Sequence, residues 1–338
     1  MEQTHLYSSH HNVNLLTAAL LAHNIRHVVV CPGSRNAPIV HNLVVNGEFF
    51  LHAVTDERSA AFVALGVCLK QREGVALCVT SGSALLNTLP GVAEAAFRPL
   101  LVISADRPAE FHGILDGQTL PQVDALEPYA STWQVAESSP CDDLSTREAL
   151  ASAFAQFVSS PRRVVHLNCP IAEPLFTFDV NDLPAFPTTA PSLIACESDG
   201  LVEKWKSELV KAELPAMVIG EMDDDAISEI VNHLRSENKM LVYAECLSQC
   251  RDHRLALWAD QHDEVVPDVV IHLGGCFVNK QFKLRLRATS RTKVLRIDES
   301  FANAIGENDK MHCPDTFFKQ PDWLRTPDVL KTIECLTG

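Results

Sequence analysis

Short apolar runs alternate with longer amphipathic stretches through the first half of the chain. Runs rich in β-branched residues, as at 26–31 and 75–80, predict strands, and apolar residues at helical spacing, as at 12–23, predict a helix. The unbroken run from Val28 to Val30 is typical of a strand covered on both faces. Regular strand–helix alternation predicts a doubly wound parallel sheet. Further strands are expected at 49–54, 100–104 and 163–167, and further helices from Ala37 and at 59–69, 84–96 and 146–158.

The alternation stops in a segment that holds Pro184, Pro187 and Pro191. Such a segment without periodicity is typical of an interdomain linker. We therefore expect a first domain at 1–178, a linker at 179–195 and a second, smaller α/β domain of Rossmann-like layout at 196–338. Within the second domain, the pattern predicts helices at 201–212, 226–238 and 327–335, and strands at 216–220, 240–244, 266–273 and 293–297.

Charge and cysteine content narrow the class of protein. The net charge of −15 over 338 residues argues against nucleic acid and anionic membranes as partners, although local arginines can still bind an anionic substrate. The eleven cysteines contain no C-x-x-C pair, which predicts a reduced, cytoplasmic protein, and no metal ligands are expected. The apolar run at 14–22 follows no basic residue and reads as a first helix, and no stretch is long enough to span a bilayer.

Several common nucleotide and hydrolase signatures are missing. The sequence has no G-x-G-x-x-G, no G-x-x-x-x-G-K-[ST] and no G-x-S-x-G. A nicotinamide dehydrogenase, a P-loop kinase and an α/β-hydrolase are therefore disfavoured.

Glu57 is the strongest candidate for chemistry. It follows a short apolar strand and lies in the first turn of an apolar helix, where Asp56 can cap. A carboxylate there is also favoured by the helix dipole alone, so a structural role competes. Two other turns, Pro32 to Arg35 and Thr80 to Ser83, follow neighbouring strands of the expected sheet. Ligands bind where such turns meet, at the carboxyl edge of a parallel sheet.

Two arginines follow buried strands in the same manner. Arg35 ends the turn that begins with Pro32, and Arg107 follows Asp106 after another strand. The guanidinium fork matches carboxylate and phosphate groups. A surface position or an internal salt bridge is the competing explanation.

Four segments, taken in their order, resemble one enzyme family. They are Val30-Cys31-Pro32-Gly33-Ser34-Arg35-Asn36-Ala37-Pro38, Thr55-Asp56-Glu57-Arg58-Ser59-Ala60-Ala61-Phe62, Thr80-Ser81-Gly82-Ser83-Ala84 and Ser104-Ala105-Asp106-Arg107-Pro108. Together they resemble the N-terminal half of the thiamine-diphosphate-dependent 2-succinyl-5-enolpyruvyl-6-hydroxy-3-cyclohexene-1-carboxylate synthases of menaquinone biosynthesis. The match is dense in the first domain and looser in the second.

The resemblance implies roles for these residues. In the family, a glutamate of the pyrimidine-binding domain, here Glu57, contacts N1′ of the cofactor. The turn Thr80, Ser81 and Gly82 would then adjoin the cofactor. Arg35 and Arg107 would bind substrate carboxylates, with Ser34 and Gln118 as polar neighbours. Lys280 is a weaker match, because Gln281 stands where a second basic residue is expected. The implied enzyme is a homodimer or homotetramer that decarboxylates 2-oxoglutarate and adds the resulting carbanion to isochorismate.

One part of the family pattern is absent from these 338 residues. Family members carry a third domain that binds the cofactor diphosphate through Mg²⁺, marked by Gly-Asp-Gly and later asparagines. In this sequence Asp-Gly occurs at Asp116 and Asp199, and neither follows a glycine. We therefore expect an incomplete chain without the diphosphate domain, which by itself neither binds thiamine diphosphate tightly nor turns over.

Two other functions stay open at this point. The chain fits a fragment of another thiamine-dependent 2-oxoacid decarboxylase or acetolactate-type synthase, although two arginines favour a substrate rich in carboxylates. It also fits a non-catalytic α/β protein that binds small anions at its sheet edge. A downstream Gly-Asp-Gly segment in the reading frame would support the synthase, and a stop codon would support the binding protein.

Overall fold

The computed structural model divides the chain into two compact units, Met1–Ser192 and Leu193–Gly338. It describes residues 6–71, 74–95, 98–136, 143–159, 164–190, 199–220, 240–244, 248, 266–274, 278–288, 292–298, 322–325 and 329–337. Each unit has its own parallel sheet and its own core clusters. The expected doubly wound α/β fold is confirmed.

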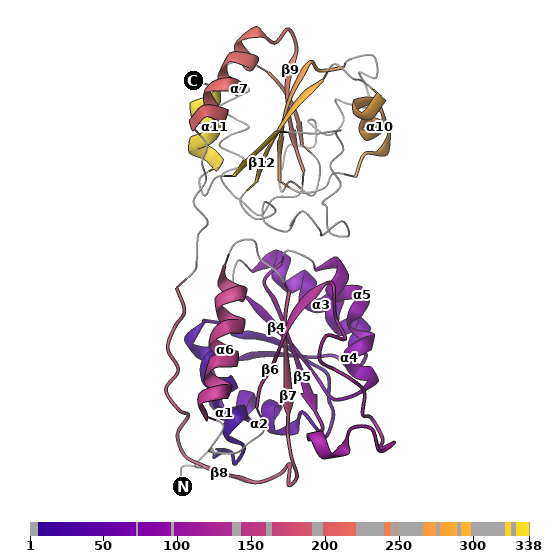
Figure 1. Ribbon diagram of the computed structural model, residues 1–338, viewed down its shortest axis with the longest axis vertical. Helices are drawn as coiled ribbons and strands as arrows, with labels where there is room; N and C mark the ends of the chain where they lie inside the picture. Colours follow the sequence, from indigo (N-terminus) through magenta and orange to yellow (C-terminus); the bar gives the residue numbers. More distant parts are fainter. Residues whose placement is uncertain are drawn as a thin grey trace. The chain divides into compact units, whose positions relative to one another are not determined.

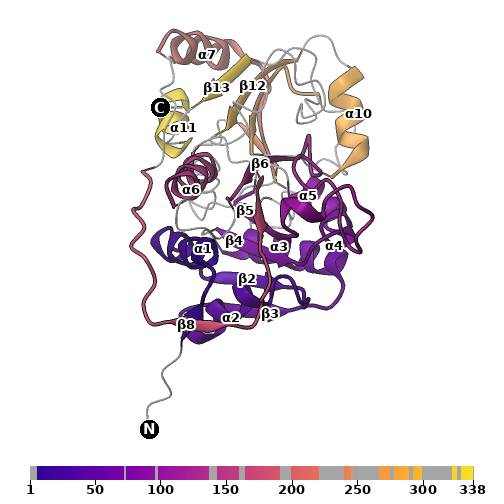
Figure 2. The ribbon, with the colours of Figure 1, turned by 60° about the horizontal axis from the view of Figure 1, so that its bottom comes forward.

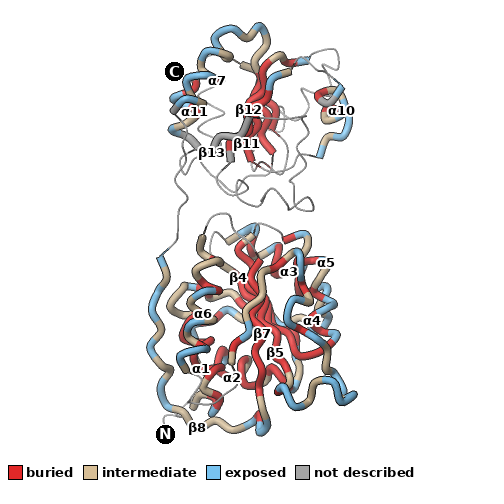
Figure 3. Tube along the Cα trace, in the orientation of Figure 1, coloured by how far each residue is buried: buried red, intermediate tan, exposed pale blue. Residues whose placement is uncertain are grey.

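Six strands build the sheet of the first unit, in the order β3-β2-β4-β5-β7-β6, and every neighbouring pair is parallel (Figure 1). Non-consecutive neighbours such as β2 and β4 reflect helical crossovers, as the alternation predicts. The central strands are buried along their whole length, which explains their unbroken apolar runs (Figure 3). The strands are β2 His27–Val30, β3 Phe50–Ala53, β4 Val75–Val79, β5 Leu100–Asp106, β6 Ala130–Gln134 and β7 Val164–Pro170.

Helices cover both faces of this sheet (Figure 2). One core cluster joins α1, α2 and α6 to one face, where Leu16, Ile39 and Phe154 are buried. A second cluster joins α3, α4 and α5 to the other face through Ala60 and Leu85. The helices are α1 His11–Ala22, α2 Ala37–Asn46, α3 Glu57–Lys70, α4 Ser83–Asn87, α5 Leu89–Glu94 and α6 Asp143–Val158, with a short 3₁₀ helix, η1, at Ala109–Phe111.

Two features of the first unit differ from the sequence expectation. The helix expected at 84–96 is broken at Thr88, and α5 starts afresh with Pro90 in its first turn, where a missing N–H costs little. Strand β6 lies in a stretch that the pattern left irregular. It is a sheet edge with mixed burial, so its sequence, Ala-Ser-Thr-Trp-Gln, carries no apolar run.

A second, two-stranded sheet ties the start of the chain to the end of the first unit. Strands β1, Tyr7–Ser8, and β8, Phe178–Val180, pair antiparallel. Beyond β8 the chain stays against this unit. Ala185 O accepts a hydrogen bond from Arg147, and Thr189 N donates to His23 Nε2 at 3.0 Å. Residues 179–190 of the expected linker therefore pack on the first unit.

The described residues of the second unit form a parallel sheet of five strands in the order β10-β9-β11-β12-β13. Helices α7 and α11 cover one face, where Trp205 and Ile333 are buried, and α10 covers the other through Phe282. The helix expected at 226–238 lies outside the described residues. The elements are α7 Asp199–Lys211, β9 Pro215–Ile219, β10 Leu241–Ala244, β11 Val269–Leu273, α10 Lys280–Ala288, β12 Lys293–Asp298, β13 Asp322–Arg325 and α11 Val329–Thr337. Among the helices of the described residues, none has the length and hydropathy of a membrane span.

Candidate active site

The turns singled out in the sequence lie at one edge of the first sheet. Because all six strands are parallel, the segments that follow β2, β3, β4, β5 and β7 leave from the same side. In the order of the strands across the sheet, Glu57 follows β3 and Arg35 follows the next strand, β2. The turn at Gly82 then follows β4, and Arg107 follows β5. The turns therefore share one edge of the sheet, as the sequence predicts, and their role at that edge stays a prediction.

Close packing fixes two of these turns against their neighbours. A Cβ atom at Gly33 would lie 2.4 Å from the Cβ of Thr80, so only glycine fits where the two turns meet. Gly82 has φ +75°, and a Cβ atom there would lie 2.9 Å from the backbone oxygen of Gln118. Thr80 and Ser81 are buried, which leaves mainly the backbone of this turn to meet a ligand.

Gly82 offers a direct test of this packing. Gly82→Ala is expected to destabilise the first unit by about 1–3 kcal/mol through backbone strain alone, because side chains rarely adopt such a conformation. The added methyl group would also push the segment at Gln118 away. Urea unfolding measures the change. Gly47→Ala is the matched control, since Gly47 has φ +77° with no atom within 4 Å of its Cβ direction, and it should cost clearly less. Equal losses in both variants would contradict the close approach.

Glu57 begins α3 and is half-buried. Its helix is capped by Asp56, whose side chain accepts a hydrogen bond from Ser59 N at 2.8 Å, and that bond lowers the pKa of Asp56. Glu57 is also close enough to Cys31 to act on it. The pKa of the Cys31 thiol is raised to about 12, first by burial and then by the negative charges of Glu57 and Asp56. The carboxylate thus acts through its charge on an uncharged, buried thiol that directly follows β2.

The apolar helix that follows Glu57 divides its residues between two faces. Ala60, Ala61 and Ala64 are buried against the sheet. Phe62 and Val63 are exposed at 45% and 40%. The apolar residues of this helix that face the core are therefore small, and the phenylalanine points to the exposed side.

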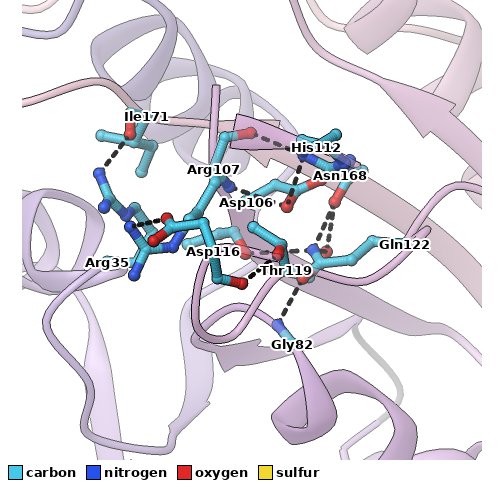
Figure 4. A network of polar contacts seen from close by, with 12 residues as sticks. Arg35, Gly82, Asp106, Arg107, His112, Asp116, Thr119, Gln122, Asn168 and Ile171 are labelled. Carbon is cyan, nitrogen blue, oxygen red and sulfur yellow. Dashed lines mark hydrogen bonds and ion pairs between the residues drawn. The ribbon is translucent and has the colours of Figure 1, made fainter. Parts of the chain in front are cut away.

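Arg35 is buried, and its guanidinium group is held by residues that follow β7. Its Nη1 donates a hydrogen bond to the backbone oxygen of Ile171 at 2.9 Å, after β7. Its Nη2 lies 3.1 Å from the carboxylate of Glu173, which is mostly exposed. Burial lowers the pKa of Arg35, opposed by Glu173, and the positive charge of Arg107 lowers it further. The two arginines therefore act on each other electrostatically at this edge (Figure 4).

Arg107 pairs with an acid from the loop that follows it. Its Nη1 lies 2.9 Å from Oδ2 of Asp116. Its backbone N donates to Oδ1 of Asp106 at 2.8 Å, which orients the turn. His112 Nε2 contacts both the backbone oxygen of Arg107, at 3.1 Å, and Oδ1 of Asp106, at 3.5 Å. The segment after β5 is thus folded back on the end of its own strand.

A buried polar network lies behind these arginines (Figure 4). Asn168 donates to Asp106 Oδ2 at 2.8 Å, and Gln122 donates to Asn168 Oδ1 at 2.8 Å. The oxygen of Gln122 accepts from Gly82 N at 2.6 Å, so the network connects the turn after β4 with the turn after β5. Burial raises the pKa of Asp106, against the lowering effect of Asn168.

Sequence reasoning missed this network. The available signal was polar residues two apart in otherwise apolar strands, Ser104 and Asp106 on β5, His166 and Asn168 on β7. Residues two apart share one face of a strand. The register pairs Ser104 with Asn168, so these side chains meet. Asp116 and Glu173 were missed because they lie in loops, where pairing depends on the path of the chain.

The remaining predicted residues are less constrained. Ser34 and Gln118 are exposed, Ser34 beside Arg35 and Gln118 in the loop after η1 with φ +57°. Lys280 is the first residue of α10 in the second unit, and its role stays a prediction. Among the described residues, no group of three or more His, Cys, Asp or Glu side chains is arranged to hold a metal ion.

Comparisons with known proteins add independent information. Residues 11–127 match the family described as "Thiamine pyrophosphate enzyme, N-terminal TPP binding domain". The chain is similar to the 2-succinyl-5-enolpyruvyl-6-hydroxy-3-cyclohexene-1-carboxylate synthases of Bacteroides fragilis, with 35% identity over 310 residues, and Flavobacterium psychrophilum, with 32% over 318. These matches cover 83% and 88% of this chain but 53% and 56% of the relatives, so the chain spans about half of their length.

A solved structure has the same fold. It is described as "X-ray structure of a putative thiamin diphosphate-dependent enzyme isolated from Mycobacterium smegmatis". The TM-score is 0.67 and the sequence identity 18%, with 98% of this chain and 62% of that chain covered. At this identity the likeness concerns the fold alone.

Proposed function

The chain belongs to the 2-succinyl-5-enolpyruvyl-6-hydroxy-3-cyclohexene-1-carboxylate synthase family, whose curated members it spans over about half of their length, and we propose that its first unit is the pyrimidine-binding part of such an enzyme. One observation carries the proposal. The carboxylate of Glu57 and the guanidinium groups of Arg35 and Arg107 follow strands of one parallel sheet at one edge. A carboxylate for the cofactor and two cations for the substrates are the groups that this reaction requires.

The surroundings of Glu57 fit the aminopyrimidine end of thiamine diphosphate. With a pKa of about 12, Cys31 is an uncharged thiol at neutral pH, and buried Ala60 adds a methyl group nearby in the helix. An apolar surface beside one carboxylate suits a heterocycle that needs a proton shared at N1′. When bound, the cofactor supplies the electron sink that stabilises the negative charge left by decarboxylation. Glu57 holds the shared proton, and the turn Thr80, Ser81 and Gly82 offers its backbone.

The arginines fit substrates with several carboxylates. In this proposal Arg35 and Arg107 bind 2-oxoglutarate and isochorismate, each of which carries two carboxylates. Ser34 and Gln118, which are exposed, are the proposed polar neighbours, and Lys280 stays a predicted substrate-binding residue. Buried Arg35 is held by the backbone oxygen of Ile171 in addition to the side chain of Glu173, so its guanidinium group stays in position if Glu173 turns away.

The rest of the proposal concerns the whole enzyme. It is a transferase of menaquinone biosynthesis in the cytoplasm, active as a homodimer or homotetramer, with Mg²⁺ bound together with the cofactor diphosphate. A preparation limited to these 338 residues is proposed to be inactive, because it spans about half of its relatives.

The activity of the protein encoded by the whole gene tests this function. With thiamine diphosphate and Mg²⁺ present, we expect it to release CO₂ from 2-oxoglutarate and to consume isochorismate. Pyruvate, which lacks the second carboxylate, is the matched control substrate and should react poorly. Turnover of pyruvate at the same kcat/KM as 2-oxoglutarate would instead assign an acetolactate-type reaction. If neither 2-oxoacid reacted, the remaining alternative would be a non-catalytic protein that binds small anions at its sheet edge.

A further inference from the structure

The two arginines at the sheet edge are held by different kinds of partner. Arg35 donates to the carbonyl oxygen of Ile171, a backbone group that stays in place as long as β7 is folded. Arg35 also contacts the exposed side chain of Glu173, at 3.1 Å, but the bond to Ile171 holds it when Glu173 turns away. Arg107 is paired with the side chain of Asp116, which can turn away by rotating its own bonds, so a ligand that replaces Asp116 takes over the charge pairing of this arginine.

The contact between Arg107 and Asp116 leaves bonding capacity unused. One guanidinium nitrogen, Nη1, lies 2.9 Å from Oδ2 of Asp116. Within the described residues, Nε of Arg107 and Oδ2 of Asp116 are nevertheless buried atoms without a hydrogen bond of acceptable geometry. A carboxylate placed side-on can accept from two guanidinium nitrogens at once, which makes it a stronger partner. Asp116 provides a weaker version of that contact.

The loop that carries Asp116 is poorly supported by packing. Leu115 has φ +60°, and its side chain is fully exposed, while neighbouring Ile114 is 64% exposed. A leucine in the left-handed region costs about 1–2 kcal/mol. Loops with backbone strain and few buried apolar contacts are the parts of a fold that rearrange at low cost. Moving Asp116 away from Arg107 therefore disrupts little else.

We propose that Asp116 occupies the place of a substrate carboxylate on Arg107, and that a dicarboxylate binds by displacing it. The inference rests on the proposed function in one respect, the choice of 2-oxoglutarate as the natural dicarboxylate. Asp116 keeps the guanidinium charge compensated while the site is empty. It also sets a threshold, because an anion must pair with Arg107 better than Asp116 does. Uncharged analogues lack the group needed for this exchange.

Removing the internal competitor should strengthen binding. We expect Asp116→Asn to lower the Kd of the 338-residue chain for 2-oxoglutarate by about two- to fivefold, the range for loss of one partly exposed ion pair. Calorimetric titration, or chemical-shift titration for weak binding, measures it, with the dimethyl ester of 2-oxoglutarate as the uncharged probe. Glu110→Gln is the matched control, because it removes the same charge from the neighbouring helix η1. An equal gain in both variants, or no gain in Asp116→Asn, would overturn the proposal.

A double-mutant cycle identifies the arginine through which Asp116 acts. In an Arg107→Gln background, Asp116→Asn should leave the Kd for 2-oxoglutarate unchanged. A persisting gain would mean that Asp116 acts through general charge, which contradicts the exchange. Asp116→Ser, judged folded by its thermal unfolding, serves as a second variant.

The same experiments separate this inference from the proposed function. Repeating the titration with succinate, which is not a 2-oxoacid, tests the exchange without any reference to thiamine chemistry. A gain with succinate in Asp116→Asn supports the exchange even if the whole protein fails to decarboxylate 2-oxoglutarate. If the whole protein decarboxylates 2-oxoglutarate but Asp116→Asn gains no affinity for either dicarboxylate, the proposed function stands and the exchange on Arg107 is refuted.

Discussion

Replacing Glu57 with glutamine is expected to lower CO₂ release from 2-oxoglutarate by about 10²–10⁴-fold in the whole protein, the usual contribution of a positioned acid–base group. The reason is the proton that Glu57 shares with N1′ in the proposed function. Glutamine keeps the size and the hydrogen-bonding oxygen of the side chain but cannot take up or release that proton. Glu57 is half-buried at the start of α3 and carries no part of the core, so the fold should be retained.

A neighbouring acid provides the matched control for Glu57. Asp56→Asn removes the same charge one residue earlier, and asparagine is also a good helix cap, so the bond to Ser59 N can persist. We expect this variant to release CO₂ at a rate close to that of the unmodified protein. The measurement is the initial rate of CO₂ release with saturating cofactor. A Glu57→Gln protein as active as the Asp56→Asn protein would remove Glu57 from the chemistry.

Acid should destabilise the first unit through His166, the second large effect that we expect. His166 is fully buried on β7, and burial lowers its pKa from 6.5 to about 3. The hydroxyl of Ser104 donates to Asn168 Oδ1 at 2.9 Å, so the ring Nε2–H must donate to Ser104, 2.8 Å away. Nδ1 then accepts from the hydroxyl of Thr132 at 3.2 Å. The neutral ring satisfies both partners, whereas a second ring proton would place a positive charge in a fully buried site.

The sign of the pH effect follows from the proton counts. Between pH 6.5 and 3 the unfolded chain protonates this histidine and the folded chain does not. The free energy of unfolding therefore falls as the pH is lowered through this window. The loss from His166 should reach about 3 kcal/mol at pH 4.5 and about 5 kcal/mol below pH 3, at 1.36 kcal/mol per unit. His10 and His23, whose pKa values burial also lowers, add in the same direction.

Urea unfolding at pH 7 and at pH 4.5 measures this contribution. His166→Gln should narrow the difference between the free energies of unfolding at the two pH values by about 3 kcal/mol, because glutamine does not titrate. Because each protein is compared with itself at the two pH values, a loss of stability that is the same at both pH values cancels. Thr132→Val is the control, since it removes the bond to Nδ1 but leaves the histidine buried, and it should keep the pH dependence. An unchanged difference in His166→Gln would show that His166 does not titrate as described.

The sequence predicted which turns share one edge of the sheet, but it did not predict the side-chain contacts between those turns. Continuous β-branched runs such as Val28 to Val30 identified buried strands, and parallel order then required the turns at Arg35, Glu57 and Gly82 to share an edge. Strand β6 escaped because an edge strand with mixed burial needs no apolar run. The split between α4 and α5 escaped because apolar spacing continues across the break at Thr88.

The partners of the site residues depend on distances along the chain that periodicity does not encode. Arg35 meets Ile171 across 136 positions, and Gly82 meets Gln122 across 40. Such contacts depend on the order of the strands in the sheet. Strand β7 lies beside β5, although β6 and α6 separate the two strands in the chain. Residue type and position after a strand were enough to place Arg35 and Arg107 at this edge, where their role in binding stays a prediction. They did not indicate that Asp116 or Glu173 would compensate the two charges.

The antiparallel pairing of β1 with β8 bears on how the first unit can be isolated as a separate protein. A gene fragment that stops at residue 178 would delete all but the first residue of β8 and leave Tyr7 without its partner Val180. It would also remove Phe186 from its place against the core and the backbone groups that satisfy Arg147 and His23. The natural cutting point for expression therefore lies after residue 190, about a dozen positions beyond the end suggested by strand–helix alternation.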